Sequence, residues 1–373
     1  MTNTRADALQ KPQPDQIKWP RSGLLDLLGI AHPIIQAPMG QHAGPALVAA
    51  VCNAGALGSL GCGTMSIDSA RRRIAQVRHA SARPFNLNFL AHSAPLIDTE
   101  TADLVRARLA FYYGLLGLGA VPRPTDPLPR FDEKRLQLIL TTRPRAVSFH
   151  YGIPPAAMVA QIRRAGCVVI GSATTVAEAK ALEQHGVDAV IAQGIEAGGP
   201  RGTFTRGDGA GLIGTMALVP QVADAVRVPV IAAGGIADGR AIAAAFALGA
   251  SGVQIGTAFL GCQEAVVSAP YRDALRQATD DDTRLTRVFT GQQARTLRNR
   301  MTDELADAEV IDFPAQLSLT RALAKACNDR GRTDFLPLWA GQAVPLLRSL
   351  PAAALIEALV AESRLWLPRH PGH

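Results

Sequence analysis

The sequence predicts an α/β protein in which eight parallel strands close into a (β/α)8 TIM barrel. Two observations support this fold class. Short apolar runs alternate with helix-like segments along residues 33–259, a length close to the roughly 250 residues typical of such barrels. Four of the helix-like segments end at a glycine that an apolar run follows within a few residues. Glycine just past a helix supplies a left-handed cap, and a continuous apolar run suits a strand covered on both faces.

The strand candidates recur at the spacing of one strand plus one helix. Five of the seven start-to-start gaps are 21 to 28 residues long, and the two longer gaps indicate insertions at residues 91–145 and 195–215. Thr175 and Glu178 have capping-box spacing, and Asp238 is placed to cap the helix that follows it. An open doubly wound sheet is the alternative, and the absence of a G-x-G-x-x-G motif after the first strand argues against it. The predicted strands are residues 33–39, 56–60, 84–90, 146–152, 168–174, 189–194, 229–235 and 252–259.

The remaining segments are expected to flank this barrel. Residues 1–32 would form an N-terminal extension and residues 33–262 the barrel itself. Residues 263–373 show helical patterning with no further strand rhythm, so we expect a helical subdomain that packs at the barrel mouth. The glycine-rich insertion after the sixth strand is expected on the active face, where barrel loops carry function.

Composition, charge and cysteine usage restrict the class of protein. Hydrophobic residues make up 48% of the chain and charged residues 18%, as in ordinary globular proteins. The net charge is +7, but the densest basic run, Arg71–Arg83, has no interleaved aromatic residues. We interpret this run as a solvated helix face and expect no nucleic-acid partner. The five cysteines are scattered and form no C-x-x-C pair, which favours buried thiols in a reducing compartment.

Two long stretches without charged residues, 31–67 and 241–263, raise the question of membrane insertion. Gly, Pro, Gln and Ser interrupt both stretches, whereas a spanning helix needs about 20 predominantly apolar residues in a row. The first twenty residues are polar and contain no apolar signal segment. We therefore expect packed interior segments, no membrane partner and a cytoplasmic location.

The ends of the predicted strands are polar but uncharged. Catalytic groups of a TIM barrel sit at the carboxyl ends of its strands, yet no Asp, Glu or Lys falls at any of the eight ends. Divalent-metal and Schiff-base chemistry therefore lack the groups they need, and we expect no metal. Amides, glycines, an imidazole and a thioether suit a planar organic cofactor better. The strand-end residues are Met39, Gly40, Asn86, Asn88, His150 and Gln193.

Two glycine-containing loops after the last two strands predict a phosphate site. Loops at these positions commonly bind phosphate in this fold, because glycine lets backbone N–H groups approach an anion and a helix N-terminus adds a favourable dipole. The alternative is that the glycines only permit tight strand-to-helix turns. The candidate phosphate residues are Gly234, Gly235, Gln254, Ile255, Gly256 and Thr257.

Three histidines lie near the predicted rim. His150, at the end of the fourth strand, has an imidazole that titrates within reach of neutral pH, so it is a candidate catalytic acid or base. The alternative for His150 is a hydrogen-bonded structural role. His42, just past the first strand, and His92, after the third, are further candidates for pocket residues.

Six motifs stand in order along residues 33–342: PIIQAPM, PFNLNFL, SFHYG, AQGIEAGGPRG, AAGGIADGRAIAAAFALGASGVQIGTAF and PLWAGQ. Together they resemble the nitronate monooxygenases, formerly called 2-nitropropane dioxygenases. The resemblance implies an FMN-dependent TIM barrel that oxidises alkyl nitronates with molecular oxygen and without a metal.

The resemblance also implies roles for particular residues. Asn88 and Gln193 would hydrogen-bond the flavin or its ribityl chain, and Met39 would line the isoalloxazine ring. Three segments would hold FMN, the last two of them through its phosphate: Gly198, Gly235 and Gln254–Thr257.

One position departs from the family pattern. The family loop usually reads E-A-G-G-H-R-G with an active-site His, whereas Pro200 stands at that place here. Proline cannot accept a proton, so three interpretations stay open. His150, which matches a second family His, does the acid and base work alone; or the substrate arrives as a preformed nitronate and needs no base; or the activity is shifted. His150 or Arg201 would stabilise the negative charge of the substrate.

The sequence therefore predicts an FMN-dependent oxidoreductase that acts on a small nitronate or nitroalkane with O2. One alternative is an NAD(P)H-dependent quinone or enoyl reductase on the same barrel, which the missing loop His favours. A different class is a flavin-free barrel that binds a sugar phosphate, or a non-catalytic phosphate-binding module. A homodimer is compatible with the sequence.

Overall fold

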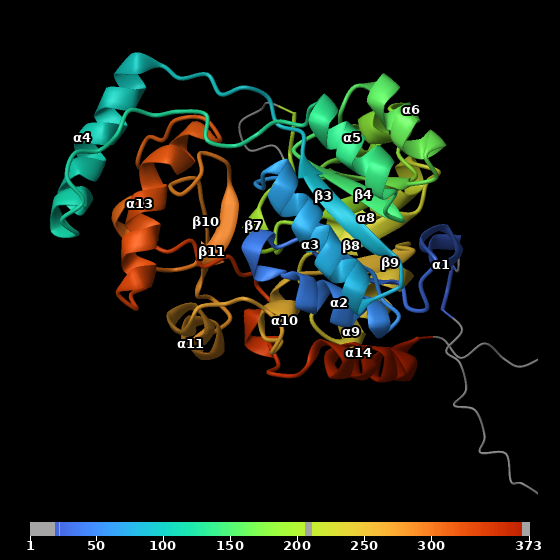
Figure 1. Ribbon diagram of the computed structural model, residues 1–373. Helices are drawn as coiled ribbons and strands as arrows, with labels where there is room; N and C mark the ends of the chain where they lie inside the picture. The colour runs from blue at the N-terminus through green and yellow to red at the C-terminus, as the bar shows by residue number, and fades with distance from the viewer. Residues whose placement is uncertain (1–18, 22, 206–210, 368–373) are drawn as a thin grey trace, which may run out of the picture.

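The structure, a computed structural model, describes residues 19–21, 23–205 and 211–367 (Figure 1). Eight parallel strands form one sheet in the order β1-β9-β8-β6-β5-β4-β3-β2. The two outer strands meet through a parallel bridge between Ile35 and Leu57, so the sheet closes into a barrel. This confirms the TIM barrel and excludes the open sheet. The strands are β1 (Ile34–Gln36), β2 (Gly58–Gly61), β3 (Phe85–Leu90), β4 (Ala146–His150), β5 (Val168–Ala173), β6 (Ala189–Gln193), β8 (Val230–Ala233) and β9 (Gly252–Ile255).

The predicted strands begin within two residues of the observed ones, but the first and the last are shorter than predicted. β1 ends at Gln36, and β9 ends at Ile255 because Thr257 already begins the short helix α10 (Thr257–Leu260). The helices predicted from capping residues also form. The Thr175 hydroxyl accepts from the amide of Glu178, and the Asp238 carboxylate accepts from the amide of Ala241.

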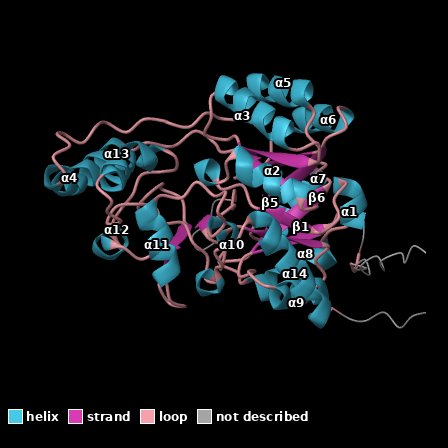
Figure 2. Ribbon diagram, turned by 60° about the horizontal axis from the view of Figure 1, so that its bottom comes forward, coloured by secondary structure: helices cyan, strands magenta, loops and turns pink. Residues whose placement is uncertain are grey.

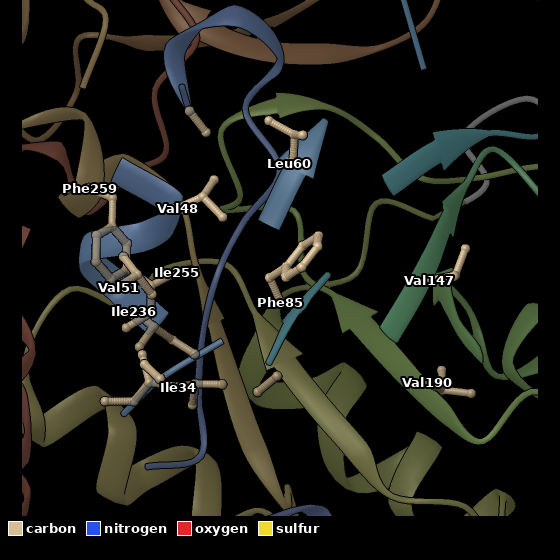
Figure 3. Close-up of a cluster of buried hydrophobic side chains, with 14 of the residues drawn as sticks. Ile34, Val48, Val51, Leu60, Phe85, Val147, Val190, Ile236, Ile255 and Phe259 are labelled. Carbon is tan, nitrogen blue, oxygen red and sulfur yellow. The ribbon is translucent and has the colours of Figure 1, made fainter. Parts of the chain in front are cut away.

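Helices surround the barrel and bury its outer face (Figure 1). Side chains alternate along each strand, so every second residue points outward against these helices. The large cluster between strands and helices includes Ile34, Leu60, Val190 and Ile255, part of which Figure 3 shows. The surrounding helices are α2 (Pro45–Asn53), α3 (Ile67–Ala80), α5 (Glu133–Thr142), α6 (Ala156–Arg164), α7 (Val176–Gln184), α8 (Thr215–Ala225) and α9 (Gly239–Ala247).

The barrel interior changes from apolar to polar along its axis. At the amino ends of the strands the inward side chains are apolar, and α1 (Gly23–Leu28) adds Leu24 and Leu28 to this cluster. Toward the carboxyl ends the inward residues become Asn88, Ser148, Ser172 and Gln193. The amino end is therefore sealed with apolar side chains, and the carboxyl end is the one equipped to bind a polar ligand.

A second core stands beside the carboxyl face of the barrel. It joins α4 (Thr99–Leu115) from the first insertion with elements of residues 260–347. Figures 1 and 2 both show α4 beside α13, on the side of the molecule away from α1 and α6. We call this unit the second core. Its other elements are α11 (Ala269–Gln277), β10 (Thr283–Thr286), β11 (Ala294–Leu297), α12 (Arg300–Glu304), α13 (Ala315–Asp329) and the 3-10 turn η2 (Val344–Leu346).

Two features of the C-terminal region differ from the prediction. β10 and β11 form an antiparallel sheet with β7 (Gly199–Pro200), although no strands were expected after residue 263. In addition, α14 (Ala352–Trp366) leaves the second core and packs on α9 and α2 of the barrel wall rather than at the mouth (Figure 1). Among the described residues, no helix has the length and apolarity that a membrane span requires.

Candidate functional site

A large cavity opens at the carboxyl ends of the strands, between the barrel and the second core. Its volume of about 1180 Å³ exceeds the roughly 300–1,000 Å³ of ordinary small-molecule pockets, so it has room for a cofactor and a substrate together. Most of the predicted site residues line it, whereas the candidates Asn86, His92 and Ile255 do not. The predicted residues in the lining are Met39, Gly40, His42, Asn88, His150, Gln193, Gly198, Gly234, Gly235, Gln254, Gly256 and Thr257.

Ile255 lies outside the cavity because of the direction of its side chain. Its side chain is fully buried in the outer cluster with the barrel helices and does not line the cavity. The alternation of the strand explains this position, because Gln254 points inward and its neighbour must then point outward.

One end of the cavity is formed mostly by backbone. Gly234 and Gly235 have φ values of 113° and 70°, which only glycine adopts readily. A Cβ atom at Gly234 would lie 3.0 Å from the amide nitrogen of Ala197, and one at Gly198 would lie 2.5 Å from that of Gly341. Side chains are thus excluded here, and the exposed backbone suits an anion such as phosphate.

The PLWAGQ segment of the second core completes this end. The amide of Gly341 donates to the Thr257 hydroxyl at 2.9 Å, and the amide of Gln342 donates to the Glu196 carbonyl at 3.0 Å. Residues more than 80 positions apart in the chain therefore close the glycine-lined end from opposite sides.

The helix after Gly235 does not contribute its N-terminus, contrary to the prediction of a helix dipole there. The first amide of α9, that of Gly239, donates to the Glu362 carboxylate of α14 at 3.0 Å. The Asp238 side chain occupies a second amide of the same turn. Two carboxylates at this helix start already satisfy its amides, so an anion in the cavity would meet the glycine loops rather than the N-terminus of α9.

Amide side chains on β3 and β6 have fixed orientations. The Asn88 amide nitrogen donates to the Ser148 hydroxyl at 3.0 Å, which leaves its oxygen for a ligand. Asn86 donates to the same hydroxyl at 2.9 Å from deeper in the barrel. Gln193 is different: its nitrogen donates to the Pro200 carbonyl at 3.1 Å and its oxygen accepts from the Gly202 amide at 2.7 Å. Gln193 therefore holds the loop at the cavity edge.

His150 is anchored to the same loop. Its Nε2 lies 3.2 Å from the Pro200 carbonyl and must donate, because a carbonyl only accepts. Nδ1 faces Gly202, where a Cβ atom would lie 3.1 Å from it. Burial lowers the pKa of His150 to about 4, so the imidazole is neutral at pH 7.

Arg201 does not reach the cavity, so the prediction that it could stabilise substrate charge is wrong. The side chain is 1% exposed, and its guanidinium donates to the carbonyls of Gln193 at 2.8 Å and Gly211 at 2.6 Å. Desolvation lowers its pKa to about 10, which leaves it charged at neutral pH. Arg201 therefore stabilises the glycine-rich loop from a buried position.

A subdomain at the barrel mouth was predicted from the sequence, but the residues with which it lines the cavity were not. We call the side of the cavity formed by the second core the outer wall. It carries aromatic and cationic groups, and among the described lining residues Arg321 and Lys325 are the two cations. The one carboxylate among the described residues of the whole cavity lining is Glu196. It accepts hydrogen bonds from the Thr215 amide at 2.9 Å and the Thr215 hydroxyl at 2.7 Å. The sequence did point to one residue of this wall, because Trp339 belongs to the PLWAGQ motif. The outer wall comprises Ser268, Tyr271, Thr320, Arg321, Lys325 and Trp339.

The residues present fit a flavin nucleotide. Gln254 points into the cavity from β9, and its buried side-chain oxygen has no hydrogen-bond partner. A buried acceptor without a partner costs about 1–3 kcal/mol, so a donor on a bound ligand would relieve it. The glycine-lined end has room for a phosphate, and the uncharged side chains of the barrel face leave room for a planar ring.

A glycine-lined end joined to a deep cavity at the carboxyl face, with uncharged side chains on the barrel strands, is the arrangement expected of a barrel enzyme that binds a nucleotide-like cofactor. A family model described as nitronate monooxygenase matches residues 21–362, so the chain belongs to the nitronate monooxygenase family, a family of flavin-dependent oxidoreductases.

Individual relatives agree with this assignment. Nitronate monooxygenases of Pseudomonas aeruginosa and Paraburkholderia phytofirmans share 44% and 42% identity, over 91% and 92% of this chain and 98% and 95% of theirs. A crystal structure of nitroalkane oxidase from Streptomyces ansochromogenes shares 40% identity with a TM-score of 0.85, over 92% of this chain and 99% of that one. The reductase alternative is therefore the weaker one.

Proposed function

We propose that this enzyme binds FMN and uses it to oxidise alkyl nitronates with molecular oxygen. The observation that carries the proposal is the continuity of one cavity, from its glycine-lined end to the neutral polar side chains of the barrel strands. Family membership is the reason to expect a nitronate substrate and a flavin cofactor. The residues that line the cavity are the reason to expect that a flavin fits. FMN, when bound, supplies the ring that takes electrons from the substrate.

Particular residues would hold the cofactor. The backbone of Gly234, Gly235 and Gly256 would bind the terminal phosphate, with Thr257 beside them. The side-chain oxygens of Asn88 and Gln254 would accept hydrogen bonds from donors of the ring or ribityl chain. Met39, whose sulfur would lie 4.0 Å from a Cβ atom placed on Gly256, would line the ring face.

Other residues would act on the substrate. Arg321 gives the outer wall a positive charge, which favours entry of a nitronate anion, whereas Lys325 is already paired with the Asp329 carboxylate. We propose His150 as the catalytic residue of the barrel rim: its neutral ring, fixed by Pro200, would orient the substrate without adding charge. The apolar and neutral lining removes water from the anion, which strengthens each remaining polar contact.

Oxygen consumption tests the proposal directly. The FMN-loaded enzyme mixed with an alkyl nitronate in air should consume oxygen far above a blank of free FMN, and mass spectrometry of the released cofactor should give FMN. No consumption above the blank would refute the activity. Rapid anaerobic bleaching of the flavin by NADH or NADPH would instead support the reductase.

The location is a separate proposal. All five cysteines are buried and unpaired, and burial raises the pKa of Cys62 to about 12. Free thiols of this kind support a reducing compartment, and we propose the cytoplasm.

A further inference from the structure

The helix α4 presents an apolar stripe to solvent. Leu104, Phe111 and Leu115 are 51%, 63% and 47% exposed, and Ala107 and Gly114 beside them are exposed as well. Residues three, four and seven positions apart lie on one side of a helix, so these five residues form a single surface, which we call the α4 face. Single apolar side chains are common on a protein surface, but a group of them on one helix marks a site of interaction.

The α4 face points away from the rest of the molecule. On its other side α4 packs against α13, where the Tyr113 hydroxyl donates to the Leu319 carbonyl at 2.7 Å. Arg330, at the end of α13, donates to the Leu116 carbonyl at 2.9 Å. Figures 1 and 2 both show α4 at the edge of the molecule, beside α13. Within the part of the chain that the structure describes, no residue of α4 lines the cavity, so the α4 face is separate from the site described above.

The order of residues on the α4 face suits a second copy of the same face. Positions 104, 107, 111 and 114 are spaced by three, four and three residues, a spacing that is the same in both chain directions. Large and small residues alternate along these positions. In an antiparallel pair with a two-fold axis at the level of Leu109, Leu104 of one copy lies level with Gly114 of the other, and Phe111 lies level with Ala107. Each large side chain therefore meets a small residue, as close helix packing requires.

The charges at the two ends of α4 are complementary in the same arrangement. Glu100 lies exposed in the first turn of the helix. At the other end, the exposed Arg330 is held beside the Leu116 carbonyl. The two-fold axis places the end of one α4 level with the first turn of the other, so the guanidinium of one copy approaches the carboxylate of its mate. The two helix dipoles also run in opposite directions, which favours the pair.

The exposed area is sufficient for a specific dimer. Leu96 and Ile97, directly before the helix, are also exposed and extend the apolar surface beyond the α4 face. Together these side chains expose roughly 500 Å² on one copy, so two copies would bury about 1,000 Å², which is the lower limit for a specific interface. An interface of this size predicts a dimer in exchange with monomer rather than a permanent one.

We propose that the α4 face is the interface of a homodimer, in which the α4 helices of two copies pack antiparallel about a two-fold axis. Each copy contributes the same residues, as in any contact across such an axis. The proposal is independent of the proposed function, since it requires neither a flavin nor a nitronate. Because α4 packs on α13, which brings Arg321 to the cavity, the dimer contact also stabilises the outer wall from its far side.

Light scattering after gel filtration tests the proposal on the full chain. At high protein concentration the wild type should have twice the 39.3 kDa mass of one chain, and it should dissociate on dilution. Phe111→Glu places a charge near the centre of the interface on both copies. It should weaken the dimer at least about 100-fold, because buried central aromatic residues dominate binding energy. The matched control is Met216→Glu, since Met216 is also an exposed apolar residue but lies on α8 of the barrel. The control should dimerise as the wild type does.

A pair of substitutions tests the antiparallel geometry. Ala107→Phe puts two phenylalanine side chains at the same level and should weaken the dimer about as much as Phe111→Glu does. Combining Ala107→Phe with Phe111→Ala restores a large residue opposite a small one, so the affinity should return to within about tenfold of wild type. Both positions are exposed in one copy, so circular dichroism and thermal unfolding should show that every variant is folded.

Several results would overturn the proposal. A wild type that stays monomeric at every concentration has no such interface, and a dimer of Phe111→Glu as tight as that of wild type would place the interface elsewhere. A monomeric wild type that binds vesicles of phosphatidylcholine and phosphatidylserine, with binding lost in Phe111→Glu, would make the α4 face a lipid-binding surface. A double variant that dimerises no better than Ala107→Phe alone would contradict the antiparallel pairing.

Discussion

The barrel face and the outer wall of the cavity are built from opposite kinds of groups. The barrel face presents glycine backbone and neutral side chains such as Asn88 and Gln254. The outer wall presents the aromatic ring of Tyr271 and the cations Arg321 and Lys325. The difference suggests a division of labour, in which the barrel holds a cofactor by shape and hydrogen bonds while the wall attracts the substrate by charge. Each prediction below changes one side and measures whether the other is affected.

The largest effect is expected from Gly234→Val. A Cβ atom there would lie 3.0 Å from the Ala197 amide nitrogen on a backbone with φ of 113°, so the loop must move and the phosphate site is lost. FMN affinity should fall at least 100-fold, about 2.7 kcal/mol, as measured by fluorescence titration of the apoprotein. The control is Gly114→Val, because Gly114 has open space around it in α4. Normal FMN binding by Gly234→Val would show that the glycines serve only the turn.

Acid should destabilise the fold through His150. The unfolded chain binds a proton on this residue near pH 6.5, whereas the folded chain does so only near pH 4. Its contribution to stability is therefore complete above pH 6.5 and is lost as the pH falls toward 4. The free energy of unfolding should drop by up to about 1.4 kcal/mol per pH unit from this group. Urea titrations of His150→Asn should show a shallower pH dependence than those of wild type, and an equal slope would contradict the burial of a neutral ring.

Gln254→Leu should separate cofactor binding from stability. It removes a buried oxygen that has no partner in the protein, so the apoprotein should be as stable as wild type or slightly more stable. FMN affinity should fall about tenfold, equal to about 1.4 kcal/mol, because a ligand donor loses its acceptor. Thermal melts of the apoprotein measure the change in stability, and FMN titration measures the change in affinity. A destabilised apoprotein with unchanged FMN affinity would mean that Gln254 serves the barrel alone.

The smallest effect is expected from Arg321→Gln on the outer wall. Loss of one rim cation should raise KM for a nitronate about threefold at low salt, leave kcat and FMN affinity unchanged, and matter less as salt screens the charge. Arg71→Gln, on the exposed face of α3, is the matched control. A drop in FMN affinity with Arg321→Gln would break the division between the two sides.

The same division explains what could be predicted from the sequence. Barrel strands alternate with helices at a regular spacing, and the rule that functional groups follow the carboxyl ends of the strands correctly predicts Asn88, His150 and Gln193 as cavity residues. The inward and outward alternation would also have excluded Ile255, had it been applied to the last strand. Local periodicity therefore carries most of the information about the barrel face.

The outer wall depends on contacts that no local pattern encodes. β7 is two residues long and pairs with β11 across more than 90 positions, and the polar run Thr283–Thr286 has no strand-like alternation. The burial of Arg201 under its loop, and the occupation of the α9 start by Glu362, are likewise long-range. The sequence of a single chain gives the residue type at each of these positions but does not show which distant residue it contacts.

The return of α14 to the barrel wall has a practical consequence for engineering. The chain leaves the barrel after α10, builds the second core, and docks again on α9 and α2 through α14. The segment that forms the outer wall is therefore an insertion between two parts of the chain that both pack in the barrel. α4, which follows β3, belongs to a second insertion. Chimaeras that exchange both segments between relatives would change the outer wall while the strands and the glycine loops of the barrel stay as they are, provided that the PLWAGQ segment is kept.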